Sequence, residues 1–436
     1  MRGRNKELFG LIPASLLLTA GFAAVFIQRS NQLSTVSLTY GAVFLGLCLA
    51  AHIFIRLTLP YADPYIFPLV AVLACFGLVM VYRIGGPTYA RQQAQWFVVG
   101  LLLFAGTIIV FRDYRKLENY RYVIVVASLG LLVLPRFFPP VNGAYLSINF
   151  GSVSFQPTEF AKVGLVIFLA SYLRDTRQVL ISGRKILGIR LPPLKHLGPV
   201  LLLWGMAMVI LLLLHDIGSS LMFYGGLLAI LYVATGRVSF VVIGVIAFGL
   251  GAWYLGAHIA HIDSRVDAWL HPFNKANYNA VGGSFQLANA QFLQAAGGLF
   301  GLGFDQATLT VPGTTFPWLP AAKTDMIYAV ITGELGLFGA TGLLTVYLIF
   351  VWRGFKTATL ARDSFSKLMA TGLSAIVALQ VFVIVGGVTR VIPLTGVTLP
   401  FVSYGGSSIV ANFVLVALLL LVSDRARRQI ARGPSG

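Results

Sequence analysis

The sequence is poor in charge, and especially in acid. Only 11% of its 436 residues are charged, and 14 Asp and Glu residues stand against 32 Lys and Arg. Soluble domains carry about 25% charged residues, so the composition excludes an ordinary soluble protein. Hydrophobic residues make up 57% of the chain, which predicts an integral membrane protein.

Cysteine is also scarce. Cys48 and Cys75 both lie in apolar runs, which predicts buried packing residues and says nothing about disulfides. The net charge of +18 is compatible with nucleic acid as a partner, but basic loops beside membrane spans give the same value. The placement of the basic residues must therefore decide between the two.

Apolar runs long enough to cross a hydrocarbon core of about 30 Å occur about twelve times. They begin near Leu8, Tyr40, Tyr65, Trp96, Tyr122, Glu159, Val200, Ser219, Val238, Asp325, Leu368 and Pro400. We therefore expect an all-α, polytopic membrane protein with about twelve transmembrane helices. The sequence contains no convincing internal repeat, so residues 1–436 are expected to form a single membrane domain.

Lys and Arg gather in alternate loops, at residues 2–6, 112–121, 174–195, 353–367 and 425–432. Cytoplasmic loops are enriched in these residues. The pattern predicts that both termini are cytoplasmic and that the one long gap between spans, residues 257–324, is a large extracellular loop. Nucleic acid is not expected as a partner, because the basic residues follow the topology and form no continuous groove.

The long loop is polar, aromatic and rich in glycine. Disordered segments are poor in aromatic residues, whereas this loop contains Trp269, Phe273, Tyr278, Phe285, Phe292 and Phe300. Loops of this length are usually functional or disordered. We therefore expect a folded lid whose aromatic rings are buried.

Ionisable residues near membrane depth are costly and therefore informative. Glu159 and Lys162 are three residues apart and share a helix face. They form either an internal salt bridge that lets the helix insert, or one wall of a polar cavity for a sugar or headgroup. Asp216 follows His215, and it either caps the next helix or lines the outer mouth of the same cavity.

Thr324 and Asp325 resemble a helix start with an acid in the first turn. Glu334 lies nine residues further on, about two and a half turns along that helix. A carboxylate at this depth needs a partner or a water-filled space.

Residues 388–408 interrupt an apolar region with prolines, glycines and serines. Broken backbone at membrane depth is tolerated where it is buried in protein or lines a cavity. Close helix packing at small residues is the other interpretation. The candidate site residues of this segment are Ser403, Tyr404, Gly405, Gly406 and Ser407.

Seven segments carry a family resemblance. They are QPTEFAK at Gln156, HDIGSSL at His215, RVDAWLHPF at Arg265, GGSFQ ending at Gln286, GGLFGLGF at Gly297, LPAAKTDMIYAVITGELG at Leu319 and PLTGVTLPFVSYGGSS at Pro393. In this order and spacing the chain resembles the SEDS family of shape, elongation, division and sporulation proteins (RodA-, FtsW- and SpoVE-like). The common members have about ten helices, so about twelve helices resemble the longer actinobacterial type. In such members an extra pair belongs to the N-terminal helices, here within residues 1–120.

The resemblance implies a peptidoglycan glycosyltransferase that polymerises lipid II at the outer face of the bacterial cytoplasmic membrane, for cell-wall elongation or division. Implied partners are lipid II, a class B penicillin-binding protein (a transpeptidase) and membrane lipid. No cofactor is required by this assignment, and a divalent cation is left open. The alternatives are a lipid II flippase or transporter and a catalytically silent scaffold for the transpeptidase.

The resemblance also implies site residues. Its catalytic aspartate lies in the large loop, seven residues before the glutamine of an Asp-Pro-x-Gly-x-Gly-Tyr-Gln pattern, and that position is Asn279 here. An amide cannot accept a proton as a carboxylate does. Either Asn279 is an inactivating substitution, or the longer loop aligns differently, or another carboxylate such as Asp267 or Asp263 replaces it. Asp267 also has a structural interpretation, an ion pair with Arg265.

Two further departures are His271, where the family often has an aspartate, and the absence of an Arg-Trp pair in NGAYLSINFG from Asn142. The substrate cavity implied by the motifs is lined by Glu159, Lys162, Asp216, Gln286, Thr324, Asp325, Glu334 and the Ser403 to Ser407 turn.

Overall fold

The computed structural model describes residues 2–30, 35–140, 145–151, 153–181, 184–186, 189–191, 194–279, 283–308 and 319–432. The helices are α1 (Arg2–Ser30), α2 (Thr35–Thr58), α3 (Ile66–Val110), α4 (Arg121–Val133), α5 (Thr158–Ile181), α6 (Leu194–Leu213), α7 (Ile217–Thr235), α8 (Val238–His258), α9 (Ala260–Leu270), α10 (Lys275–Asn279), α11 (Phe285–Gly297), α12 (Ile327–Leu360), α13 (Ser364–Val388) and α14 (Gly406–Ala431). Two 3-10 helices, η1 (Tyr114–Tyr120) and η2 (Leu134–Phe137), flank α4.

The strands form two short antiparallel hairpins. One pairs β1 (Ile148–Phe150) with β2 (Val153–Phe155), and the other pairs β3 (Arg184–Ile186) with β4 (Ile189–Leu191). All the other regular elements of the described residues are helices. Nine of these helices are long and apolar enough to cross a membrane. The expected all-α, multi-pass membrane fold is therefore confirmed, whereas the count of twelve spans stays a prediction.

Helix α3 is folded back on itself. As one straight helix its 45 residues would extend about 68 Å, more than twice the hydrocarbon core. The chain breaks at Gly86, which adopts φ 77°, and Pro87 follows without an N–H to donate. The rings of Phe67 and Phe104, from opposite ends of α3, lie 5.9 Å apart. The two limbs are therefore antiparallel, and the second begins at Pro87, earlier than the expected start near Trp96.

Helix α12 breaks at Gly336, where φ is 66°. The loop after α11 packs against this break: Leu302 N donates to Gly333 O (2.9 Å), and Leu337 N donates to Gly298 O (3.0 Å). A Cβ at Gly336 would lie 2.4 Å from Gly301 N. The glycine-rich segment GGLFGLG therefore serves a close backbone approach, which leaves a short limb, 327–335, before the long limb of α12.

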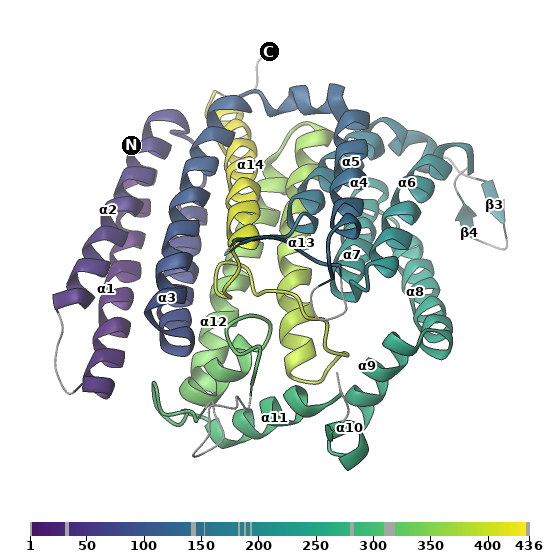
Figure 1. Cartoon of the computed structure of the whole chain (residues 1–436). Coiled ribbons are helices and arrows are strands. Elements are labelled where there is room, and N and C mark those ends of the chain that lie inside the picture. Colours follow the sequence, from purple (N-terminus) through teal and green to yellow (C-terminus); the bar gives the residue numbers. More distant parts are fainter. Residues whose placement is uncertain are drawn as a thin grey trace.

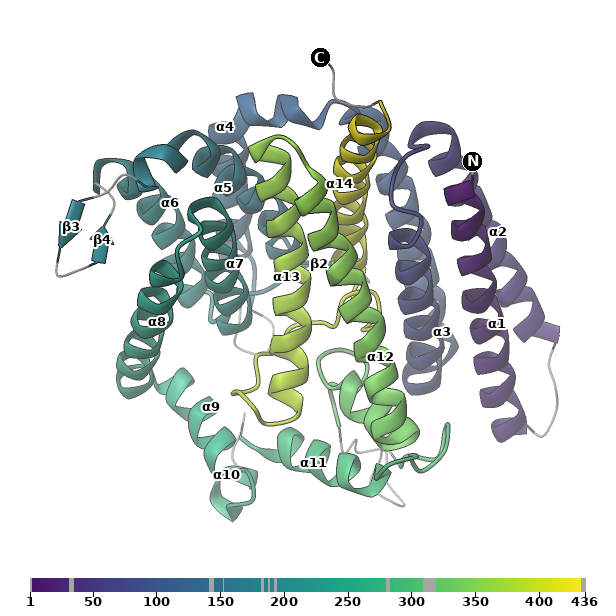
Figure 2. The ribbon, with the colours of Figure 1, turned by 180° about the vertical axis from the view of Figure 1, so that it is seen from behind.

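The start of α1 and the end of α14 lie at the same end of the bundle, opposite α9, α10 and α11 (Figure 1 and Figure 2). Ion pairs hold the end with the termini together, and Asp63 pairs with both Arg353 and Arg427. Tyr114 OH and Ser366 Oγ lie 2.6 Å apart and join η1 to α13. Loops that the Lys and Arg pattern assigned to the same side of the membrane therefore meet at this end of the bundle.

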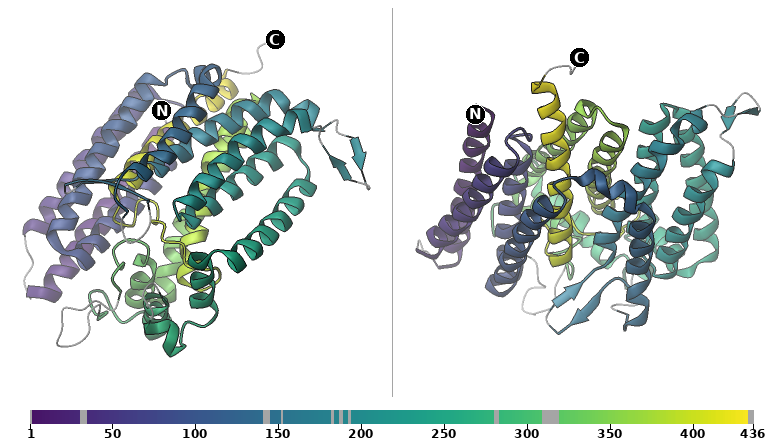
Figure 3. Two further views of the ribbon diagram at one scale, coloured as in Figure 1. Left: turned by 45° about the vertical axis from the view of Figure 1, so that its right-hand side comes forward. Right: turned by 90° about the horizontal axis from the view of Figure 1, so that it is seen from above.

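Helices α1 and α2 flank one side of the bundle, and α6 to α8 flank the other, with α14 between them when seen from above (Figure 3). Lipid-facing surface is extensive on α8, where Val245, Trp253 and Tyr254 are exposed. Buried residues concentrate instead in α3, α13 and α14. The polar groups discussed below lie where these central helices meet α5, α7 and the lid.

The long loop forms the expected folded lid over its described parts. Arg390 donates from Nε to Trp269 O (2.9 Å), and Trp269 Nε1 donates to Arg390 O (3.1 Å). Gln291 and Gln294 both donate to Val388 O, at 2.9 and 3.1 Å. These bonds fix α9 and α11 to the end of α13.

The expected burial of the lid's aromatic rings is wrong for three of them. Phe273, Phe292 and Phe300 are 55%, 57% and 79% exposed. Phe273 and Phe292 pack on each other with ring centroids 5.5 Å apart. The lid is held by the pairing between these two rings and by its hydrogen bonds to α13, rather than by burial of the rings.

Candidate active site

Asp216 is a buried carboxylate with one satisfied and one unsatisfied oxygen. As the N-cap of α7, its Oδ1 accepts from Ser219 N at 2.9 Å. Its Oδ2 is buried without a hydrogen-bond partner. Burial raises the pKa of Asp216, the nearby Glu159 carboxyl raises it further, and Ser219 and Arg265 lower it. Asp216 thus caps the helix, as one interpretation held, and keeps a free oxygen.

Arg265 brings a cation from the lid. It lies on α9, and its guanidinium donates to Leu394 O at 3.0 Å. Burial lowers the pKa of Arg265, while Asp216 and Asp325 raise it. One arginine therefore interacts electrostatically with two carboxylates from different parts of the chain, one before α7 and one before α12.

Asp325 is the second of these carboxylates. Its Oδ1 accepts from Thr324 Oγ1 at 2.9 Å, and the Thr324 hydroxyl also reaches Ala321 O at 3.1 Å. Burial raises the pKa of Asp325, and Thr324 and Arg265 lower it. The expectation that Asp325 lies in the first turn of α12 is wrong, since the helix begins at Ile327 and its N-cap, Met326, makes no side-chain cap.

Together Glu159, Asp216, Arg265 and Asp325 form what we call the Arg265 cluster. Three of its members are acids and one is a base, and all four come from separate elements: α5, the α6–α7 turn, α9 and the segment before α12. Arg265 is the member of this cluster that belongs to the lid. Carboxylates with pKa values raised by burial beside a single charge partner are typical of functional sites.

Lys162 has a structural role. Its ammonium group donates to Glu159 Oε2 (2.5 Å), Gln380 Oε1 (2.9 Å) and Asn412 Oδ1 (3.3 Å). A lysine has three protons to donate, so this set uses all of them. The expected contact between Glu159 and Lys162 is confirmed, and the bonds favour the internal salt bridge joining α5, α13 and α14.

The broken segment before α14 connects several elements. Ser403 Oγ donates to Thr324 O (2.5 Å) and accepts from Leu399 N (2.9 Å). Tyr404 OH donates to Gln92 Oε1 (2.6 Å), and Ser407 Oγ accepts from Gln156 N (2.9 Å). The turn is buried in protein, as one interpretation of broken backbone requires.

Of the two glycines in this turn, only Gly406 leaves little room for a side chain. A Cβ on Gly406 would lie 2.3 Å from the ring of Trp96, while one on Gly405 would meet Thr398 at an ordinary 3.5 Å. Gly405 N also reaches Gln93 Oε1 at 3.4 Å. Close packing at Gly406 therefore sets where α14 starts against the second limb of α3.

Glu334 finds its partner outside the Arg265 cluster. Arg83 Nε donates to Glu334 Oε1 at 2.7 Å, and the same nitrogen lies 2.7 Å from Asp305 Oδ1. Arg83 also donates to Ala307 O at 2.7 Å. The group joins the turn of α3 to the lid and to the break in α12.

The loop residues predicted from the family pattern are more exposed. Asn279 ends α10 and is exposed, and Asp267 is exposed on α9. Arg265 faces Asp216 and Asp325, so the expected ion pair with Asp267 is wrong, because residues two apart on a helix point to different faces. His271 is exposed, and Gln286 has a buried Oε1 without a hydrogen-bond partner. Residues 141–144 and 280–282, parts of two predicted motifs, lie outside the described residues.

Arg265 itself was absent from the predicted site. The motif RVDAWLHPF contains Arg265, but only the fold shows that Arg265 interacts with Asp216 and Asp325, which are distant in the sequence. Gln92, Gln380 and Asn412 were missed as well, because an amide inside an apolar helix gives no periodic signal.

The donor set does not fit a resident metal. Among the described residues no group of three His, Cys, Asp or Glu side chains is arranged to hold an ion. The Arg265 cluster also contains a competing cation. We therefore assign no metal-dependent step to the protein's own residues.

Comparison with known proteins gives consistent matches. The family model for FtsW, RodA and SpoVE, described as cell cycle proteins, matches residues 63–428. Peptidoglycan glycosyltransferase RodA of Mycobacterium leprae is 38% identical over 441 residues, covering 99% of this chain and 92% of that protein. Stage V sporulation protein E of Bacillus subtilis is 31% identical, covering 82% of this chain and 95% of that protein.

A solved structure agrees with these matches. A chain from a peptidoglycan synthase complex that coordinates polymerization and crosslinking is 27% identical, with a TM-score of 0.67, and the match covers 84% of this chain and 99% of that chain. The family match begins after α1 and α2. On sequence and on fold, this chain belongs to the FtsW/RodA/SpoVE family of cell cycle proteins.

Proposed function

We propose that this protein is a peptidoglycan glycosyltransferase that polymerises lipid II at the outer face of the cytoplasmic membrane. The observation that carries the proposal is the Arg265 cluster, in which a lid arginine interacts electrostatically with the buried Asp216 and the half-buried Asp325. The relative named above as a peptidoglycan glycosyltransferase favours the same activity over a transporter.

The reaction needs a base and a cation. A sugar hydroxyl of one lipid II attacks the anomeric carbon of another, the hydroxyl proton goes to the base, and the bond to the polyprenyl pyrophosphate breaks. Arg265 is the residue we assign to the leaving pyrophosphate, since a guanidinium binds phosphate oxygens in a fork.

Asp216 is the residue we assign as the base. Its Oδ2 has no donor to compete with a hydroxyl, and burial raises the pKa of this carboxyl toward the working pH. Asn279 has no carboxylate, and both Asn279 and Asp267 are exposed on the lid. We assign Thr324, Gln286 and the Ser403 to Ser407 turn to shaping the substrate site, and Glu159 to tuning Asp216. Glu334 and Lys162 hold the surrounding helices.

The whole chain is one membrane domain in this proposal, with both termini in the cytoplasm and residues 257–324 outside. Helices α1 and α2 are the extra pair of the N-terminal region, residues 1–120. The structural relative from a synthase complex supports a transpeptidase of the class B penicillin-binding type as the partner.

The test is polymerisation of labelled lipid II by the purified protein in vesicles, read as a glycan ladder on a gel, with and without Mg²⁺ or Mn²⁺. We expect a ladder from the wild type and from Asn279→Asp. A ladder from Asn279→Asp alone would make Asn279 an inactivating residue and the chain a scaffold. Translocation of a fluorescent lipid II analogue with no ladder from either protein would make the chain a transporter.

A further inference from the structure

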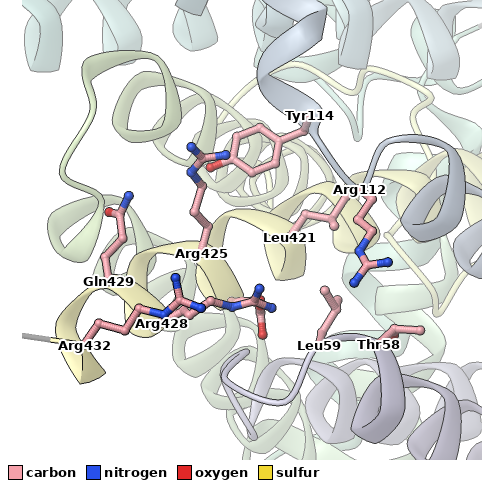
Figure 4. Close-up of a pocket in the computed structure, with 10 residues that line it drawn as sticks. Thr58, Leu59, Arg112, Tyr114, Leu421, Arg425, Arg428, Gln429 and Arg432 are labelled. Atoms are coloured by element: carbon pink, nitrogen blue, oxygen red, sulfur yellow. The ribbon is translucent and has the colours of Figure 1, made fainter.

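A basic pocket lies at the end of the bundle that carries the termini, and it shares no residue with the Arg265 cluster. It has a volume of about 280 Å³ and is formed by the end of α2, the turn between α3 and η1, and the last turns of α14. Figure 4 shows Arg425, Arg428 and Arg432 along α14, with the Arg425 side chain beside Tyr114 and Arg112 on the facing turn. A second hollow of about 610 Å³ shares Arg112 and Arg425 with it.

The arginines that line this pocket outnumber the acidic residues that could neutralise them. Four arginines and a single acid, Asp424, line it. Asp424 already binds Arg428 at 2.6 Å and accepts from Tyr61 N at 2.8 Å. Arg425 has Asp113 at 3.5 Å, while Arg112 and Arg432 have no ion-pair partner within the described part of the chain.

Two donor groups in the pocket are also unused. The Nε atoms of Arg425 and Arg428 are buried and have no hydrogen-bond partner. A buried, charged N–H without an acceptor is costly. An oxyanion with several acceptor oxygens would satisfy both and would neutralise part of the excess charge.

The approach to the pocket is apolar. Leu57 on α2 is 78% exposed next to Thr58, which lines the pocket. Ile109 and Val110 on α3 are 64% and 72% exposed, immediately before Arg112. Another hollow combines Val110 and Phe111 with Arg112 and Lys116. A ligand that fits this surface carries hydrocarbon beside its anionic group.

We propose that this pocket binds the phosphate headgroup of an anionic phospholipid from the leaflet on the side of the termini. Basic pockets between transmembrane helices on the cytoplasmic side recognise such headgroups. The phosphate oxygens bind Arg112, Arg425 and Arg428, and Arg432 adds positive charge to the pocket lining. The acyl chains lie along the exposed faces of α2 and the second limb of α3. The lipid thereby joins α14 to both of these helices.

The experiment is native mass spectrometry of the full-length protein with added phosphatidylglycerol or phosphatidylcholine. We expect phosphatidylglycerol to bind more tightly to the wild type and to weaken about fivefold for each arginine removed. The test variant is Arg112→Gln/Arg432→Gln, since both side chains are exposed and have no ion pair to lose. The control is Arg362→Gln/Lys367→Gln, which removes the same charge from exposed positions that do not line the pocket.

Equal weakening in both double variants would overturn the proposal, because it would show a general surface-charge effect. Equal binding of the two lipids to the wild type would overturn it as well. Inorganic phosphate and glycerol phosphate form a further arm. We expect neither to displace phosphatidylglycerol, and displacement by either at millimolar concentration would assign the pocket to a soluble phosphate compound instead. None of these results depends on glycosyltransferase activity, so they stand apart from the proposed function.

Discussion

Asp216 is the N-cap of α7 and also the proposed base, and two substitutions distinguish these roles. Asn is about as good an N-cap as Asp, whereas Ala loses the cap. We expect Asp216→Asn to stay within about 1 kcal/mol of the wild-type stability at neutral pH, and Asp216→Ala to lose about 1 to 2 kcal/mol. Thermal unfolding in one detergent measures both, and equal losses in the two variants would contradict the capping assignment.

Stability should depend on pH through the same residue. Because burial raises the pKa of Asp216, the folded protein binds a proton that the unfolded chain has already released between the ordinary aspartate pKa and the raised one. Stability contributed by this group is therefore present at low pH and lost as the pH rises through that window. We expect Asp216→Asn to flatten this part of the dependence of stability on pH, and an unchanged slope would argue against a raised pKa at Asp216.

Arg265 should set the pH dependence of activity. It lowers the pKa of both Asp216 and Asp325. Removing it in Arg265→Gln raises both pKa values, so the acid limb of the activity profile moves to higher pH. If Arg265 had only a structural role, Arg265→Gln would lower the rate at every pH and leave the acid limb in place. Rates measured from pH 4 to pH 9, on the order of the range that carboxyl and histidine groups cover, distinguish the two roles.

Spacing predicted the contact of Glu159 with Lys162, because residues three apart share a helix face. It could not predict Gln380 and Asn412 as the other acceptors, since these lie on helices more than two hundred residues away in the chain. The same limit hid the meeting of Arg265 with Asp216 and Asp325. Local pattern identifies which residues are unusual, and only the packing of helices identifies their partners.

At the scale of elements, the two breaks in long helices determine where the site is built. Apolar runs predicted spans near Tyr65 and Asp325, but a run of apolar residues does not show where a helix turns. The break at Gly86 makes two antiparallel limbs, and the break at Gly336 separates a short limb of α12 that begins beside Asp325. Positive φ at these glycines is the physical cause.

The break in α12 gives a matched pair of variants. Gly336→Ala introduces a Cβ 2.4 Å from Gly301 N at a φ of +66°, whereas a Cβ at Gly342 of the same helix meets nothing within 4 Å. We expect Gly336→Ala to destabilise the protein by about 2 kcal/mol or more. Gly342→Ala should be neutral or stabilising by up to about 1 kcal/mol. Similar unfolding temperatures for the two variants would show that the break tolerates a side chain.

At the scale of the whole molecule, the asymmetric charge of the two ends predicts the orientation in the membrane. Lys275 in the lid and Lys367 at the start of α13 are both exposed, and the native cysteines are buried. We expect a membrane-impermeant maleimide added to intact cells to label Lys275→Cys and to leave Lys367→Cys unlabelled until the cells are opened. The reverse pattern would invert the topology and place the lid in the cytoplasm.

The central claim is that the Arg265 cluster polymerises lipid-linked disaccharides with Asp216 as the base. Its most direct measurement is the initial rate of glycan formation from labelled lipid II by wild type and Asp216→Asn, at equal concentrations of folded protein. We expect a glycan ladder from the wild type and a loss of at least about a hundredfold in the variant. Equal rates from two equally stable proteins would contradict it.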